Sequence, residues 1–387
     1  MPYPADELWC IDQVSGKPLF RIQHLNISGK AKFFYEFAAR SSILVKAVNH
    51  AAVQGVNLTD NWKITDGCNV LLLDHADYRR SDDGLLVKDC YTLSIFERSL
   101  ARPNDRLELF FHFNCSADFD FEAAKLAMAI EYDPTAEYYL NGHRLKEDFT
   151  GYFIDRGIRV LALPIEFLKE GENEFKIVMQ FLQSDRTRAS MERAKHFESE
   201  ANKLYFDSEI EAIYLLGNFS CHPEKITRDK DRNAFVSKKI RIKNMPETVS
   251  LGSLIEAGFI FFSGHLKLSG NFELTEEEAG VLRVLKFTPF KANSVTVTLN
   301  GKELPTVYTA PYQLDVSGLL KPGNNTIQLE LATSCRNTFG PMHTAEIEPL
   351  SISPVSFLME KDHRGNLPPE CTEEYGVLEN GFEICLQ

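Results

Sequence analysis

Two stretches of the sequence decide the fold: YYLNGHRL at Tyr138–Leu145 and VTLNGKEL at Val297–Leu304. Ahead of the second Asn-Gly, Val295, Val297 and Leu299 alternate with Thr296 and Thr298, which predicts a half-buried strand. Asn-Gly readily adopts positive φ at both central positions of a type I′ turn, so each stretch predicts a β-hairpin. We therefore expect one structural unit to occur twice in the chain.

A second pair of matching stretches follows the hairpins. LKEGENEFKI runs from Leu168 to Ile177, and LKPGNNTIQL runs from Leu320 to Leu329. Pro322-Gly323 fits a type II turn, which needs positive φ at its third residue. The segment between hairpin and turn is shorter in the second copy. The repeat is therefore one unit with a loop of variable length.

Short apolar runs separated by turn signals precede both hairpins. They are Leu109–Phe113 and Leu126–Ile130 in the first copy, and Leu266–Leu268 and Leu282–Leu285 in the second. This spacing is typical of an antiparallel β-sandwich. We expect an all-β chain with a small N-terminal β-region at residues 1–60. One sandwich is expected at 61–216, and a second, with a C-terminal tail, at 217–387.

Residues 189–204 break the β pattern. Five apolar residues recur there at helical spacing: Met191, Ala194, Phe197, Ala201 and Leu204. An apolar stripe of this kind predicts an amphipathic helix. We expect it to be an insertion that packs on the sandwich edge before the strand Ile213–Leu216.

Charge and hydropathy exclude several classes of protein. The 387 residues carry a formal net charge of −13, and no nucleic-acid partner is expected because such proteins need a basic surface. No apolar run is long enough to cross a membrane. The first ten residues, MPYPADELWC, lack both the basic and the apolar region of a signal peptide. We expect a cytoplasmic protein, or a chain cut from a larger one.

The eight cysteines are scattered, and none forms a C-x-x-C pair. Zinc-ribbon and thioredoxin motifs are therefore excluded, and reduced, mostly buried thiols are expected. One or two disulfides remain an alternative. No histidine spacing resembles H-E-x-x-H. Asp82 with Asp83, and Asp229 with Asp231, lie in charged stretches that could hold a structural Ca²⁺, and no other cofactor is expected.

The motifs, taken in order, resemble the non-catalytic modules of large bacterial glycoside hydrolases, α-L-rhamnosidase-like and family 2-like enzymes included. Both copies contain the strand ending in LNG and the L-x-x-G-x-N turn. The second copy continues into RNTFGPMH at Arg336–His343, which is similar to the R-N-x-x-G-P-x-H ending of such modules. The Trp9 strand near the start is similar to the small β-region that follows a catalytic barrel.

This resemblance implies tandem galactose-binding-like jelly-roll β-sandwiches with a short helical insertion and a small N-terminal β-region. In the family the catalytic carboxylates lie on a barrel, which needs repeated strand–helix units over about 250 residues. Nothing in the sequence predicts that barrel, so no catalytic residue is carried over. The implied partners are a carbohydrate ligand or an upstream catalytic domain.

Two pairs of acidic residues are candidates for catalysis. Glycoside hydrolysis needs two carboxylates about 5–10 Å apart, and Asp74 with Asp77 or Asp118 with Asp120 could supply them. We interpret all four as turn acids and loop charges. No G-x-S-x-G motif occurs. The run His222–Arg232 is interpreted as a solvated loop, and packing against a catalytic domain is the alternative.

A sugar site needs aromatic ring faces and planar polar groups. Of the two tryptophans, Trp9 and Trp62, the second lies in a polar stretch and is our stacking candidate, although tryptophans are more often packed. Arg336, Asn337 and His343 form a polar cluster in the sequence. We interpret it first as a set of loop-fixing hydrogen bonds and second as a ligand contact.

Three functional hypotheses follow. The chain is a non-catalytic carbohydrate-binding or scaffolding region related to glycoside hydrolases. Alternatively, it is a glycosidase whose sandwich has two facing carboxylates, at least one of them with a raised pKa. The third hypothesis is a purely structural module with an exposed apolar face around Phe33, Phe34 and Phe37.

Overall fold

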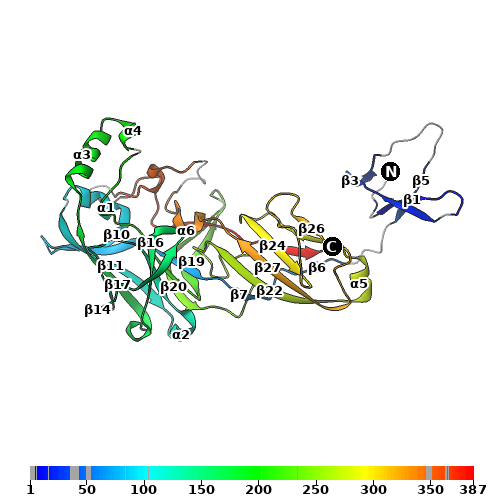
Figure 1. Cartoon of the computed structure of the whole chain (residues 1–387), viewed down its shortest axis with the longest axis horizontal. Helices are drawn as coiled ribbons and strands as arrows, with labels where there is room; N and C mark the ends of the chain where they lie inside the picture. The colour runs from blue at the N-terminus through cyan, green and yellow to red at the C-terminus, as the bar shows by residue number, and fades with distance from the viewer. Residues whose placement is uncertain are drawn as a thin grey trace.

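The computed structural model describes residues 5, 7–15, 17–34, 43–48, 54–82, 84–102, 104–201, 203–232, 234–345, 351–361, 364 and 366–387. The molecule is elongated, with two β-sandwiches along its length and a small group of N-terminal strands at one end (Figure 1). The predicted all-β sandwich class is confirmed.

The N-terminal strands form two small sheets. Their strands are β1 (Glu7–Ile11), β2 (Pro18–Ile22), β3 (Leu25–Ile27), β4 (Lys30–Lys32) and β5 (Leu44–Val48). One sheet has the order β2-β1-β5, and β3 pairs with β4. Leu8 and Ala31 are fully buried at the centre of this small core.

The first sandwich is built mainly from the chain between residues 69 and 217. Its strands are β8 (Asn69–Leu73), β9 (His75–Arg80), β10 (Leu86–Tyr91), β11 (Asp105–Cys115), β12 (Ala127–Glu131), β13 (Glu137–Leu140), β14 (His143–Arg144), β15 (Phe149–Phe153), β16 (Asp155–Ala162), β17 (Gly171–Phe181) and β18 (Ile213–Gly217). One sheet contains β10-β9-β11-β17-β13-β14, and the facing sheet contains β15-β16-β12-β18-β8. Alternate residues of β11 and β17, such as Phe111 and Phe175, fill the core between the sheets.

Three further strands extend this first sandwich. They are β19 (Phe219–Asp229), β20 (Ala234–Asn244) and β28 (Tyr375–Leu378). β19 and β20 form a long antiparallel hairpin, and β20 also pairs with β11 and with β28. The prediction of a solvated loop at His222–Arg232 is therefore wrong, because most of it lies in β19. Its charges lie on a strand that is half-exposed, a pattern the sequence alone does not distinguish from a loop.

The second sandwich has its own core. Its strands are β6 (Val56–Asn57), β7 (Trp62–Asp66), β21 (Thr248–Val249), β22 (His265–Leu274), β23 (Val284–Phe287), β24 (Ser294–Leu299), β25 (Lys302–Glu303), β26 (Gln313–Asp315), β27 (Gly323–Ala332) and β29 (Ile384–Leu386). One sheet has the order β21-β7-β22-β27-β24-β25, and the other has the order β26-β23-β29-β6. The C-terminal strand β29 thus lies within this sandwich, and the C-terminus lies at the end of the sandwich nearer the N-terminal strands (Figure 1).

The two sandwiches are interleaved in sequence. β6 and β7 precede the first sandwich, yet they pair with β29 and β22 of the second. The sheets therefore do not follow the expected boundary between residues 60 and 61, because the strand after that boundary belongs to the later sandwich. The chain leaves the second sandwich at β7 and returns to it at β21. Asn69 lies at the first of these crossings, fully buried, with its Nδ2 donating to the carbonyls of Phe219 and Gly258 at 2.8 Å each.

The repeat has a matching hydrogen-bond network in both sandwiches. Asn173 is fully buried, and its Oδ1 accepts from Asn141 Nδ2 at 2.9 Å and from Lys169 N at 3.0 Å. Asn325 is also fully buried, and its Oδ1 accepts from Asn300 Nδ2 at 2.8 Å and from the backbone N of residue 321 at 3.1 Å. In both copies the asparagine of the L-x-x-G-x-N turn thereby joins that turn to the LNG hairpin.

The hairpin turns have the predicted backbone conformation. Asn141 and Gly142 have φ of 49° and 84°, and Asn300 and Gly301 have φ of 49° and 81°. Positive φ at both central positions is the type I′ requirement. The repeat therefore arises from turn chemistry as well as from strand patterning.

Helices are short and lie between strands. They are α1 (Thr92–Leu100), α2 (Phe121–Ala124), α3 (Asp185–Ala194), α4 (Glu198–Ala201), α5 (Glu276–Val281) and α6 (Arg336–Phe339), with 3₁₀ turns at Ile165–Phe167 and Pro354–Phe357. The insertion predicted at 189–204 is confirmed as helical, but it begins earlier and is broken into α3 and α4. Ser184 caps α3 by accepting from Thr187 N. Phe197, expected on the packed stripe, is 61% exposed between the two helices.

The cysteines all lie among the described residues, and none is in a disulfide. Three of them, Cys10, Cys115 and Cys221, are buried, fewer than expected. In the part of the chain that the structure describes, no helix is long and apolar enough to cross a membrane.

Candidate functional site

A cleft of about 930 Å³ lies on the outer face of the first sandwich. Its floor consists of the side chains of β9, β11 and β17 that point away from the core, among them Asp77, His112 and Glu172. Strand β10 and the hairpin β19–β20 form walls, and one side is closed by Met359, Lys361, Glu373 and Tyr375. A sheet face that would otherwise meet solvent is thus enclosed.

The floor places a histidine between two carboxylates. His112 Nε2 lies 3.7 Å from Asp77 Oδ2, and His112 Nδ1 lies 3.7 Å from Glu172 Oε1. Asp77 Oδ1 also accepts from the backbone N of Asp89, at the β10 wall. These planar polar groups point into the cleft, where they can accept from or donate to a bound molecule.

The opposite wall contains an ion-pair network. Glu373 Oε2 accepts from Lys238 Nζ at 2.8 Å, and Glu373 Oε1 accepts from Lys361 Nζ at 2.9 Å. The hydrogen bonds and charges of these two lysines lower the pKa of Glu373 to about 2. The network joins β20 to the segment before β28, so it fixes the shape of this wall.

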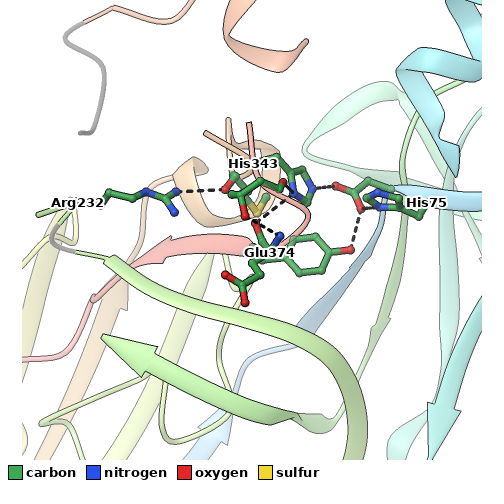
Figure 2. Close-up of polar contacts among 8 residues, drawn as sticks. His75, Arg232, His343 and Glu374 are labelled. Atoms are coloured by element: carbon green, nitrogen blue, oxygen red, sulfur yellow. Dashed lines mark hydrogen bonds and ion pairs between the residues drawn. The ribbon is translucent and has the colours of Figure 1, made fainter. Parts of the chain in front are cut away.

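Next to the cleft a buried polar cluster surrounds Asp74, and Figure 2 shows two of its members, His75 and His343. Asp74 follows β8, whose five residues are all buried, and it is itself 4% exposed. Its Oδ1 accepts from His75 Nδ1 at 2.8 Å and from the Tyr375 hydroxyl at 2.7 Å. Its Oδ2 faces His343 Nε2 at 2.8 Å. The interpretation of Asp74 as a solvated turn acid is therefore wrong.

The cluster shifts the pKa values of its members. Burial alone would raise the pKa of Asp74, but the charge of His343 and hydrogen bonds from both histidines hold it well below its usual range. Burial would lower the pKa of His75, and the hydrogen bond and charge of Asp74 raise it above its usual value. Burial and the Asp74 charge raise the pKa of Tyr375, so this phenol remains a neutral donor.

Two backbone carbonyl groups fix the orientation of the His343 ring. Its Nδ1 lies 3.2 Å from the carbonyl oxygens of both Thr372 and Glu374. Carbonyl oxygens only accept, so Nδ1 carries a proton that they share. Nε2 is then the atom directed at Asp74 (Figure 2). The neighbouring carbonyl of Met342 accepts from Arg232 at 3.4 Å, which anchors the same segment to the β19–β20 turn.

Aromatic rings enclose the cluster. The ring of His343 is 5.5 Å from that of His75, 5.6 Å from that of Tyr91 and 4.9 Å from that of Tyr375, measured between centroids. His75, Tyr91 and Tyr375 also line the cleft. The buried cluster therefore meets the cleft through these three side chains.

The predicted sugar-site residues do not come together in this cleft. Trp62 is 1% exposed in the core of the second sandwich, against Gly270, and its Nε1 donates to Leu58 O at 2.7 Å. No ring face is left for stacking. Asn337 is buried and exchanges hydrogen bonds with the backbone of Leu378, and Arg336 is half-buried in α6. His343 alone of the four belongs to the Asp74 cluster.

Sequence reasoning missed His75, Tyr91, His112 and Tyr375. One signal was available for the first: the apolar run Val70–Leu73 ends directly at Asp74-His75, where polar groups would be buried. Asp118 and Asp120 fit their interpretation as turn acids, because Asp120 caps α2. Asp83, of the possible Ca²⁺ pair, lies outside the described residues.

Comparison with known proteins gives matches only among solved structures. No known protein family and no curated protein matches this chain. A β-D-mannosidase from Dictyoglomus thermophilum is 13% identical over 68% of this chain and 31% of its own length, with a TM-score of 0.26. A rhamnosidase from Novosphingobium sp. PP1Y is 13% identical over 81% of this chain and 25% of its own, with a TM-score of 0.23.

A GH2 β-galacturonidase from Eisenbergiella tayi, solved with glycerol, is 8% identical over 71% of this chain and 38% of its own, with a TM-score of 0.26. These structural neighbours are glycoside hydrolases. The chain spans between 25% and 38% of their lengths.

Proposed function

We propose that this chain is a non-catalytic carbohydrate-binding region and that the cleft on the first sandwich is its binding site. The observation that carries the proposal is the cleft itself, about 930 Å³ in volume. This lies within the range of small-molecule sites, about 300–1,000 Å³. It is large enough for a short oligosaccharide.

The chemistry of the lining suits a sugar. Hydroxyl groups of a saccharide both donate and accept, and they are best matched by planar polar side chains. Asp77, His112 and Glu172 supply such groups on the floor. Tyr91 offers an aromatic ring in the wall for the C–H face of a sugar. This polar and aromatic combination favours a neutral or charged saccharide over an apolar ligand.

The distribution of raised carboxyl pKa values supports a non-catalytic role. A glycosidase needs a carboxylic acid whose pKa is raised so that it can donate a proton. Among the described residues, burial and neighbouring acids raise the pKa values of Glu97, Glu131, Glu209 and Glu211. None of these four lines the cleft. The pKa of Glu373, which does line the cleft, is lowered instead.

The test combines binding with turnover on the same purified chain. A glycan array should return a saccharide class that then gives a saturable isotherm by calorimetry. Aryl glycosides of the same sugar should show no release of the chromophore. Turnover that survives repurification and is lost in Asp77→Asn or Glu172→Gln would overturn the non-catalytic assignment. A folded chain without any array hit would overturn carbohydrate binding.

A second candidate function, a structural docking module, rests on the N-terminal strands. Phe34 is 89% exposed, and Leu25 and Val14 are exposed near it in sequence. Phe33 packs partly on the small core, whereas Phe37 lies outside the described residues. Exposed apolar side chains on a small unit favour contact with another protein domain. Light scattering that shows self-association reduced by Phe34→Ser would favour this candidate.

A further inference from the structure

We propose that Asp74, His75 and His343 bind a divalent transition-metal ion, with Zn²⁺ as the best fit. Each residue offers one donor atom, and these atoms all lie within 4.8 Å of one another. Two of the residues come from the β8–β9 junction and the third from the segment after α6. The metal would join parts of the chain that are distant in sequence.

The tautomer of His343 favours a cation beside its Nε2 atom. Two carbonyl oxygens face its Nδ1, so the proton of the neutral ring lies there and the lone pair lies on Nε2. That lone pair points at a carboxylate oxygen 2.8 Å away. Two lone pairs at this distance repel each other unless a cation lies between them. The cation is either a second proton on the ring or a metal ion.

The surroundings are those of a metal ligand set. Histidine ligands of metals commonly donate their other N–H to a carbonyl, which fixes the ring and raises its basicity. His343 has that arrangement already. The Tyr375 hydroxyl donates to Asp74 Oδ1 and orients the carboxylate in the same way. The supporting hydrogen bonds of a site are therefore in place without rearrangement.

Metal binding requires the donor atoms to converge on one ion. Tetrahedral Zn²⁺ with bonds of about 2.0–2.1 Å separates its ligand atoms by about 3.3 Å. The donor atoms lie within 4.8 Å of one another, and each histidine nitrogen now lies 2.8 Å from a different oxygen of Asp74. Binding therefore needs rotation of the side chains and release of the proton that His75 Nδ1 donates to Asp74.

The donor set selects the kind of ion. Two imidazole nitrogens and one carboxylate suit Zn²⁺ and its neighbours, whereas Ca²⁺ takes oxygen ligands. Three protein ligands leave a fourth position of the tetrahedron. That position is open to a water molecule, and the cleft that His75, Tyr91 and Tyr375 line is the source of such a water.

The experiment uses the whole chain, stripped with a chelator and confirmed to be folded by circular dichroism. Zn²⁺ is titrated by calorimetry, retained metal is measured after desalting, and Co²⁺ is added to a second sample. We expect one equivalent of retained zinc and the visible absorption of tetrahedral Co²⁺. A folded, stripped chain that retains no zinc and shows no such Co²⁺ spectrum would overturn the proposal, leaving a proton-bridged ion pair.

Two ligand variants and one control complete the test. His343→Gln and His75→Gln should each weaken Zn²⁺ binding by at least about tenfold, the lower end of what even a supporting residue contributes. His75 is half-buried, so the His75→Gln variant should fold. It therefore keeps the test valid even if the variant of the buried His343 does not fold. His265→Gln, an exposed histidine paired with Glu330 in the second sandwich, is the control and should bind like the parent. Equal zinc affinity in all three variants would also overturn the proposal.

Discussion

His343 Nε2 lies 2.8 Å from Asp74 Oδ2, and 269 positions separate the two residues in the sequence. Through this contact the segment that follows the second copy of the repeat returns to the first sandwich. The Tyr375 hydroxyl also donates to Asp74, and Tyr375 begins β28, which pairs with β20. The contacts of Asp74 therefore tie both His343 and the start of β28 to the first sandwich.

Replacement of Asp74 should be severely destabilising. Asp74→Ala leaves His75, His343 and Tyr375 without their shared acceptor in a buried site. Removing one partner of a buried charge network costs about 3–5 kcal/mol. Urea unfolding at pH 7 measures the loss. Asp66→Ala, which removes an exposed ion pair with Lys267, should cost less than about 1 kcal/mol. Equal losses of unfolding free energy in Asp74→Ala and Asp66→Ala would contradict the role of Asp74 as a shared buried acceptor.

The repeat asparagines should have matching effects. Asn173→Ala and Asn325→Ala each remove a fully buried amide whose Oδ1 and Nδ2 hold one turn closed. Each should lower the free energy of unfolding by about 2–3 kcal/mol, because the backbone groups lose their partners. Asn324→Ala, next to Asn325 but exposed, is the matched control for chemical denaturation. A similar loss in that control would argue against the network.

Glu131 should make stability depend on pH. Burial and the nearby Glu211 and Asp155 raise its pKa in the folded state above the unfolded value. An acid whose pKa is raised in the folded state stabilises the fold below its unfolded-state pKa. This stabilisation is lost as the pH rises through the folded-state pKa. Glu131→Gln should therefore be more stable than the parent at pH 8 and similar to it at pH 4. Thermal melts at both values measure this, with the exposed Glu122→Gln as control.

Trp62 should matter for stability and not for ligand binding. Its ring fills the core of the second sandwich, so Trp62→Ala should cost about 3–5 kcal/mol. The cleft lies on the other sandwich, and the affinity for a saccharide identified by the array should stay unchanged at a temperature where the variant is folded. A loss of saccharide affinity in the folded Trp62→Ala protein would instead place the binding site in the second sandwich.

Tyr91 should contribute directly to saccharide affinity. Its ring lines the cleft, and losing a stacking contact of roughly 1.4 kcal/mol corresponds to a tenfold weaker Kd. We expect Tyr91→Ala to weaken binding by about tenfold in calorimetry. Tyr205→Ala, an exposed tyrosine that does not line the cleft, is the control. Unchanged affinity in the first variant would contradict the proposed binding face.

The sequence by itself determined the class of the fold and its repeated unit. Alternating strands, Asn-Gly turns and L-x-x-G-x-N turns are local signals, since each depends on the preferred φ of a few neighbouring residues. They correctly indicated the hairpins at Asn141 and Asn300. The helical insertion was also visible as a periodic pattern, although its boundaries were displaced because helix ends depend on caps such as Ser184.

Only the tertiary structure decided which strands share a sheet and which polar residues meet. β7 belongs to the second sandwich because it pairs with β22, a contact that no local pattern encodes. That pairing buries Trp62 and removes it as a sugar contact. The packing of distant parts of the chain also brings His343 to Asp74, 269 positions away, a contact that neither local sequence encodes. Pairing between distant strands is chosen by the burial of whole faces, and the cleft and the cluster behind it exist only once that choice is made.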